Sequence, residues 1–325
     1  MSPPVRWKSF GWQGITLSVP HDWDLAGFEG NRRAGRFWMD DEAGLRLHAR
    51  WQQDGRRGSF DRVARRVAAR MRRDARRRGT SLSEKPGAVA LPGAETRLFR
   101  EQGDDPAWHL LTRCRHCHRV LLLSAPAARS ASLDAVRRRL FLSVGDHSGD
   151  GTDYWSAYGL RCVSPAGSRL ETADLETGRI RLSFVRRRQR LVAVRLGPAS
   201  LMLPRKPLPE WMAEAFDEVK ESSGFSGNTR EHLGHAGYEG RGVSRRRTFL
   251  LDVWPRRCEV IGRLWHCEAS DRILGACLLS PRPAQDLLDR FARSFLCHGD
   301  RLPDETASEH DEREKQTAAT PTPDA

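Results

Sequence analysis

The sequence predicts an α+β protein built from two tandem copies of one domain, each an antiparallel sheet flanked by helices. A repeated hairpin is the first observation: residues 111–121 align without a gap with residues 264–274, keeping a cysteine, an arginine and an aliphatic pair in register. Such internal repeats define the architecture. The second observation is that the same elements recur in the same order on both sides of a short polar joint. The third is the length of 325 residues with 38% hydrophobic residues, enough for two domains with separate cores.

The first copy is expected to span residues 1–144. Apolar and polar residues alternate in its strand-like segments, and the last strands form a meander. Between Ser59 and Gly79 the apolar residues recur at helical spacing, so a helix is expected there. Ser59 is a suitable N-cap, and Gly79 is a suitable residue after the C-cap. A second helix begins at Ser132. The strands are expected over residues 14–19, 35–39, 44–51, 95–101, 107–114 and 119–125.

Residues 145–153 are expected to be a linker, because they are polar and rich in turn-forming residues. They resemble the start of a calcium loop, but Ala157 stands at the twelfth position, where such a loop needs a bidentate glutamate, so a plain linker is favoured. The second copy is expected over residues 154–298. The acidic tail, residues 299–325, has almost no large apolar residues and is expected to be disordered.

In the second copy the same order is expected again. Strands are predicted over residues 159–163, 178–185, 190–196, 248–253, 260–267 and 272–279, and helices over residues 211–219 and 287–295.

The opening residues, Gly14-Ile-Thr-Leu-Ser-Val-Pro-His-Asp-Trp23, resemble the first strand and the Pro-x-x-Trp turn of the PsbP-like superfamily. This superfamily includes the extrinsic photosystem II subunit and a nuclear-transport factor that binds a small GTPase. The element order of each copy is similar as well, although Ser168 replaces the tryptophan in the second copy. The resemblance implies an α/β/α sandwich that serves as a binding or assembly module, and it carries no ligand residue over to this chain.

The formal net charge of +13 comes mostly from arginine. A GC-rich genome alone can produce such a preference, so the charge by itself is a weak indication of a polyanionic partner. The predicted helix over residues 59–79 concentrates it on one face, which could bind nucleic acid or another polyanion. Aromatic residues for base stacking are missing from that face, so this stays an alternative. The candidate residues are Arg62, Arg65, Arg66, Arg72, Arg73, Arg76 and Arg77.

The repeated hairpin contains Cys114 and Cys117, separated by two residues, with His116 and His118 beside them. The sequence matches a c-type haem attachment motif, but no export signal accompanies it. Two thiolates at a hairpin tip can bind one zinc ion, with a neighbouring histidine as a further ligand. The second copy has a serine at the position of Cys117, so the pair is not repeated. A zinc knuckle is therefore an alternative to a hairpin closed by small buried cysteines.

No motif of a known catalytic site is present, so we expect a protein that is not an enzyme and has no cofactor. Neither a targeting signal nor a run of about 20 apolar residues is found, and a cytoplasmic protein without membrane contact is expected. The preferred interpretation is a non-catalytic module for protein binding or assembly. The sequence does not identify its protein partner or its oligomeric state.

Overall fold

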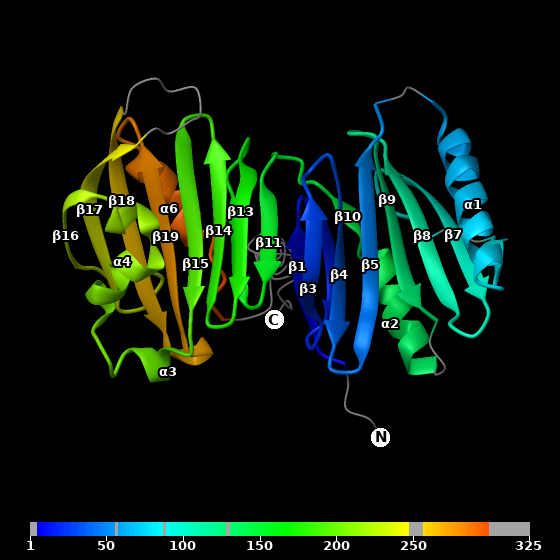
Figure 1. Cartoon of the computed structure of the whole chain (residues 1–325), viewed down its shortest axis with the longest axis horizontal. Helices are drawn as coiled ribbons and strands as arrows, with labels where there is room; N and C mark the ends of the chain where they lie inside the picture. The colour runs from blue at the N-terminus through cyan, green and yellow to red at the C-terminus, as the bar shows by residue number, and fades with distance from the viewer. Residues whose placement is uncertain (1–4, 56–57, 87–88, 128–130, 247–255, 299–325) are drawn as a thin grey trace, which may run out of the picture. The chain divides into compact units, whose positions relative to one another are not determined.

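The computed structural model describes residues 5–55, 58–86, 89–127, 131–246 and 256–298 (Figure 1). The chain divides into two compact units, residues 1–158 and residues 159–325, a few residues beyond the predicted linker. The predicted acidic tail and the predicted strand over residues 248–253 lie outside the described residues.

Unit 1 contains a seven-stranded antiparallel sheet in the order β3-β4-β5-β9-β8-β7-β6. Its strands are β3 (Asp24–Gly30), β4 (Ala34–Asp41), β5 (Gly44–Gln53), β6 (Ser81–Lys85), β7 (Ala94–Gln102), β8 (Ala107–Cys114) and β9 (Arg119–Pro126). A smaller sheet joins β1 (Trp7–Trp12), β2 (Ile15–Pro20) and β10 (Gly145–Asp146), and β11 (Asp153–Ala157) ends the unit. The helices are α1 (Phe60–Arg77) and α2 (Ala131–Leu142).

Helix α1 begins after Ser59 and ends before Gly79, as its apolar spacing predicts. Phe60, Ala64 and Ala68 lie on its buried face and pack against the sheet residues Phe99 and Leu111. Most of the helix's stability therefore comes from one apolar stripe, and its other faces are free to carry charge.

Unit 2 repeats this sheet in the order β13-β14-β15-β19-β18-β17-β16. Its strands are β12 (Leu160–Ser164), β13 (Arg169–Glu176), β14 (Arg179–Arg186), β15 (Gln189–Leu196), β16 (Ser223–Thr229), β17 (Gly237–Arg246), β18 (Arg256–Cys267) and β19 (Arg272–Ser280). Its helices are α3 (Ala199–Met202), η1 (Leu208–Trp211), α4 (Met212–Ala215), α5 (Asp217–Lys220), η2 (Glu268–Ser270) and α6 (Gln285–Arg293).

The same strand order in both large sheets confirms the duplicated domain. β8 and β9 of unit 1 occupy the places of β18 and β19 in unit 2, and the repeated hairpin joins them in both units. The residue that precedes the second strand of the hairpin has a left-handed backbone in each unit, with φ of 58° at His118 and 51° at Asp271.

The predicted α+β fold class, a PsbP-like α/β/α sandwich, is wrong. The described residues are mostly in strands, which form four antiparallel sheets, two of them with seven strands. Edge strands account for much of the difference, because β3, β6 and β16 were not predicted. Their side chains are largely exposed or half-buried, so they lack the clear alternation of a half-buried strand.

The predicted long helix over residues 211–219 is also wrong. Phe216 has an extended backbone, with φ of −131° and ψ of 113°, and it separates the four-residue helices α4 and α5. Its fully buried ring belongs to the core of unit 2. Tertiary packing therefore overrides the helical spacing of the apolar residues here.

Among the described residues, no helix is both long enough and apolar enough to cross a membrane.

Candidate metal centres

In unit 1, the repeated hairpin holds two thiols together. Cys114 is the last residue of β8, and its carbonyl accepts a hydrogen bond of 3.0 Å from the backbone N–H of His118. The turn places the backbone N–H of Cys117 3.5 Å from the sulfur of Cys114. Both sulfurs consequently lie on the same side of the hairpin tip.

Strand β10 brings two further groups to these thiols from a distant part of the chain. Asp146 pairs with Ile15 of β2, and the backbone N–H of His147 donates to the carbonyl of Gly14 at 2.6 Å. The Asp146 Oδ2 atom lies 3.3 Å from the Cys117 sulfur, and the His147 Nε2 atom lies 3.3 Å from the Cys114 sulfur. One ligand atom from each of the four side chains lies within 4.8 Å of the others.

Unit 2 contains a second group of four side chains, at the end of the equivalent hairpin between β18 and β19. Its members are His235, Cys267, Cys297 and His298, whose ligand atoms also lie within 4.8 Å of one another. The Cys297 sulfur is 3.2 Å from His235 Nε2 and 3.1 Å from His298 Nδ1. The Cys267 sulfur lies 3.5 Å from the same Nδ1 atom.

Three of the four positions correspond between the units. Cys114 and Cys267 are matched by the hairpin alignment. The other two matched pairs follow the last helix of each unit: His147 comes five residues after the end of α2, His298 comes five residues after the end of α6, and Asp146 and Cys297 precede them. Both groups are therefore versions of one site.

The fourth position differs. Cys117 comes from the turn of the hairpin in unit 1, where unit 2 has Ser270. In unit 2 the fourth ligand is His235, which lies just before β17. Strand β17 pairs with β18, the strand that ends in Cys267. By the pairing of β7 with β8, the matching residue of unit 1 is Ala94, which cannot bind a metal. Each unit thus completes its group of four from a different neighbouring segment.

Neighbouring groups orient the ligands in unit 1. The buried guanidinium of Arg119 forms an ion pair with Asp146 Oδ1, which leaves Oδ2 directed toward the thiols. The Nδ1 atom of His147 lies 3.2 Å from the carbonyl of Ser148, and a proton on Nδ1 would leave Nε2 as a free ligand. Such outer contacts fix ligating carboxylates and imidazoles in metal sites.

The electrostatics of the thiols favour a cation. Burial raises the pKa of Cys117, and the neighbouring Cys114 raises it further. Burial likewise raises the pKa of Cys297 to about 11, with Cys267 contributing. Two adjacent thiolates repel each other in a low-dielectric setting, and a divalent cation between them removes this penalty. Tetrahedral zinc with bonds of about 2.0–2.3 Å would hold its ligand atoms roughly 3.3–3.8 Å apart. The contacting ligand atoms of the two groups are 3.1–3.5 Å apart.

The ligand set predicted from sequence overlaps only in part with these groups. Cys114 and Cys117 belong to the first group, but the structure places neither His116 nor His118 in it. His116 is exposed, with its ring centroid 5.2 Å from that of His147, and His118 serves the turn through its backbone. The sequence analysis missed six residues: Asp146, His147, His235, Cys267, Cys297 and His298.

The seven arginines proposed as a polyanion-binding face all lie exposed on α1. Among the described residues, Arg77 is 3.9 Å from Asp74, and Arg65 donates to the carbonyl of Asp61 in its own helix. Binding of a polyanion by this face stays a prediction.

No protein-family model matches the chain, and no curated protein matches it. Among solved structures, the apo structure of the immunity protein TplEi of the T6SS from Pseudomonas aeruginosa aligns with 89% of this chain and 96% of that chain. The sequence identity is 12% and the TM-score is 0.36. A TM-score of this size does not establish a common fold. The resemblance to the PsbP-like superfamily stays a prediction.

Proposed function

We propose that the protein is a non-catalytic zinc-binding protein, in which each copy of the duplicated domain holds one structural zinc ion. The observation that carries this proposal is the presence of two groups of four ligand atoms at equivalent positions. A cluster of cysteine and histidine can arise by chance in one domain. Its recurrence in the second copy, with a different residue completing the set, supports retention of a common role.

The ligand types favour zinc over other common ions. The second group offers two cysteines and two histidines, and the first offers two cysteines, one histidine and one carboxylate. Sulfur and nitrogen ligands in a tetrahedral arrangement are typical of zinc, whereas calcium and magnesium require oxygen ligands. Four protein ligands leave no coordination position for a reactive water, which supports a structural ion.

None of the seven cysteines belongs to a disulfide bond. This supports a reducing compartment such as the cytoplasm, which the sequence analysis predicts. The zinc would tie the hairpin between two central strands of each sheet to the chain that follows the last helix, and so make that end of the sheet rigid. A rigid end of the sheet suits the protein-binding role predicted from the sequence, and a protein partner stays part of this proposal.

The test is the metal content of the full chain, purified under reducing conditions, exposed to zinc and desalted. We expect two zinc ions per chain by mass spectrometry of the metal. Cys117→Ser is expected to remove the ion of the first copy and His235→Asn that of the second, each leaving about one ion per chain. A chelator should lower the melting temperature of the wild-type protein.

The matched control is the double variant His116→Asn/His118→Asn. These histidines lie in the same hairpin but outside the group of four, so the variant should keep two zinc ions. Less than one ion per chain in the wild-type protein would refute the proposal. Loss of zinc in the control would show that the hairpin itself, as predicted from sequence, supplies the ligands.

A further inference from the structure

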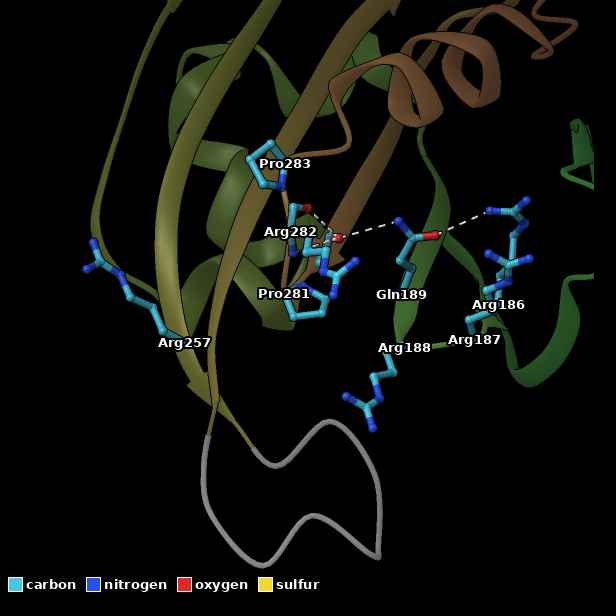
Figure 2. Close-up of a pocket in the computed structure, with 9 residues that line it drawn as sticks. Arg186, Arg187, Arg188, Gln189, Arg257, Pro281, Arg282 and Pro283 are labelled. Carbon is cyan, nitrogen blue, oxygen red and sulfur yellow. Dashed lines mark hydrogen bonds between the residues drawn. The ribbon is translucent and has the colours of Figure 1, made fainter.

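A pocket of about 710 Å³ lies at one end of the large sheet of unit 2. Three segments surround it: the β14–β15 turn, the start of β18 and the loop that joins β19 to α6. Figure 2 shows Arg257 on one side, the turn with Arg186 to Arg188 on the other, and Pro281 to Pro283 between them. Its volume falls within the range of small-molecule sites.

The lining of this pocket is strongly cationic. It includes Arg186, Arg187, Arg188, Arg257 and Arg282, and no carboxylate is among the lining residues that the structure describes. Arg186 is held by the carbonyl of Ala166 at 2.8 Å and by the side chain of Gln189 at 3.4 Å. The other four arginines are exposed, and none of them forms an ion pair within the described ranges. Four guanidinium groups therefore face solvent around one concave surface.

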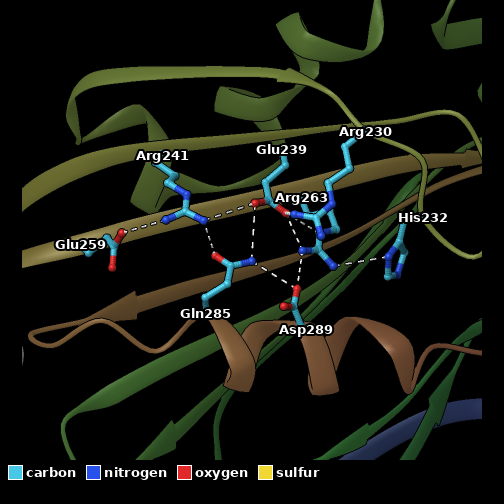
Figure 3. A network of polar contacts seen from close by, with 8 residues as sticks. All are labelled: Arg230, His232, Glu239, Arg241, Glu259, Arg263, Gln285 and Asp289. Carbon is cyan, nitrogen blue, oxygen red and sulfur yellow. Dashed lines mark hydrogen bonds and ion pairs between the residues drawn. The ribbon is translucent and has the colours of Figure 1, made fainter.

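Several arginines of the large sheet in this unit have acidic partners. Arg190 lies 2.9 Å from Glu171, and the buried Arg181 lies 2.9 Å from Glu218. Figure 3 shows Arg263 between Glu239 and Asp289, with a nitrogen–oxygen distance of 2.6 Å to Asp289. Acidic side chains thus lie beside several arginines of this sheet, whereas none is among the described residues that line the pocket.

The duplicated domain provides an internal comparison for the β14–β15 turn. The matching turn of unit 1, between β4 and β5, carries Asp40, Asp41 and Glu42 instead of arginines. The hairpin geometry therefore does not require basic residues here. The positive charge is a property of the second copy alone.

We propose that this pocket binds a small anion that carries two or more phosphate groups. Guanidinium groups bind phosphate oxygens through paired, charge-assisted hydrogen bonds. Several phosphates are needed to match four positive groups, and the concave shape favours a compact ligand over an extended polymer. Gln189 donates to the Ser280 hydroxyl at 3.4 Å, which links two of the surrounding segments. This inference is independent of the zinc sites.

The test uses the full chain, inorganic tripolyphosphate and isothermal titration at fixed ionic strength. We expect the double variant Arg187→Gln/Arg188→Gln to weaken tripolyphosphate binding at least tenfold. Arg290→Gln/Arg293→Gln, with the same charge change on α6 and outside the pocket lining, is the control and should bind like the wild type. Both pairs are exposed, so their removal should leave the melting temperature unchanged.

Three results would overturn the proposal: no binding by the wild type, equal weakening in both variants, or tighter binding of a single-stranded oligonucleotide per phosphate than of tripolyphosphate. The second result would mean that net charge alone attracts the anion. The third would mean that the arginines form part of an extended nucleic-acid surface. Binding of tripolyphosphate that only the pocket variant loses supports the proposal.

Discussion

Asp146 and Cys297 occupy the same position in the two copies: each immediately precedes the histidine that lies beside the hairpin cysteine. In unit 1 the residue is a carboxylate held by Arg119, and in unit 2 it is a thiol between two imidazoles. Both side chains can give a negatively charged ligand. The position thus keeps its charge while the ligand atom changes from oxygen to sulfur.

The first prediction follows from this exchange. Asp146→Cys should leave the ion bound and give the first copy a third thiolate, because a thiolate keeps the negative charge beside Arg119. Burial lowers the pKa of Arg119 to about 10, so this arginine remains a cation at neutral pH. In the cobalt-loaded protein, the number of coordinating thiolates should rise from four to five per chain.

The measurement is the sulfur-to-cobalt charge-transfer absorbance per chain, compared with the wild-type protein. Asp146→Ala serves as the control and should release the first ion. An unchanged absorbance in Asp146→Cys would show that residue 146 is not a ligand.

A second prediction concerns the buried arginine of unit 2. Arg263 is 3% exposed and is the shared partner of Glu239 and Asp289 (Figure 3). The substitution Arg263→Met would remove this shared ion-pair partner from two largely buried carboxylates. We therefore expect it to lower the free energy of unfolding by about 3–5 kcal/mol. Arg241→Gln is the matched control, because Arg241 is 54% exposed and its ion pairs should contribute under about 1 kcal/mol. Urea unfolding distinguishes the two, and similar losses would contradict the prediction.

A third prediction concerns the pH dependence of stability in unit 1. Burial lowers the pKa of His109 below its ordinary value of 6.5, although Glu101, 3.2 Å away, opposes the shift. Ser124 and Arg78 are the other groups close to it. Below about pH 6.5 the unfolded chain takes up a proton that the folded chain cannot bind as readily, so the free energy of unfolding falls as the pH decreases. Above that range the contribution is constant.

The measurement is urea unfolding between pH 7.5 and pH 5 for the wild type and for His109→Gln. The variant should lose less stability over this range, because glutamine does not titrate. Parallel curves for the two proteins would mean that His109 titrates alike in the folded and unfolded chains.

The sequence predicts those elements of the fold whose signals lie within a short stretch of the chain. The duplicated hairpin and α1 could be predicted because turn residues and an apolar stripe at helical spacing are visible in short windows. The edge strand β16 has mostly exposed residues, with one serine and one glycine on each side of Phe225, and it is held by pairing with β17. Its strand conformation comes from a partner that no short window contains, so the fold class was predicted with too much helix.

The metal groups show the same limit. Cys114 and Cys117 could be predicted from their spacing in one hairpin. Asp146 and His147 lie about 30 residues further along the chain, and only the pairing of β10 with β2 brings them back. Comparison of the two copies held the one usable signal, since a histidine follows the last helix at the same distance in both.

The different sources of the fourth ligand give the two copies different loop lengths. In unit 1, Cys114 and His147 are 33 residues apart, whereas in unit 2, His235 and Cys297 are 62 residues apart. A zinc ion would act as a cross-link on the unfolded chain, and each doubling of the closed loop removes only about 0.6 kcal/mol more of its conformational entropy. The second ion would therefore restrain almost twice as much chain for nearly the same entropic effect, and the segment that it closes contains β17, β18, β19 and α6.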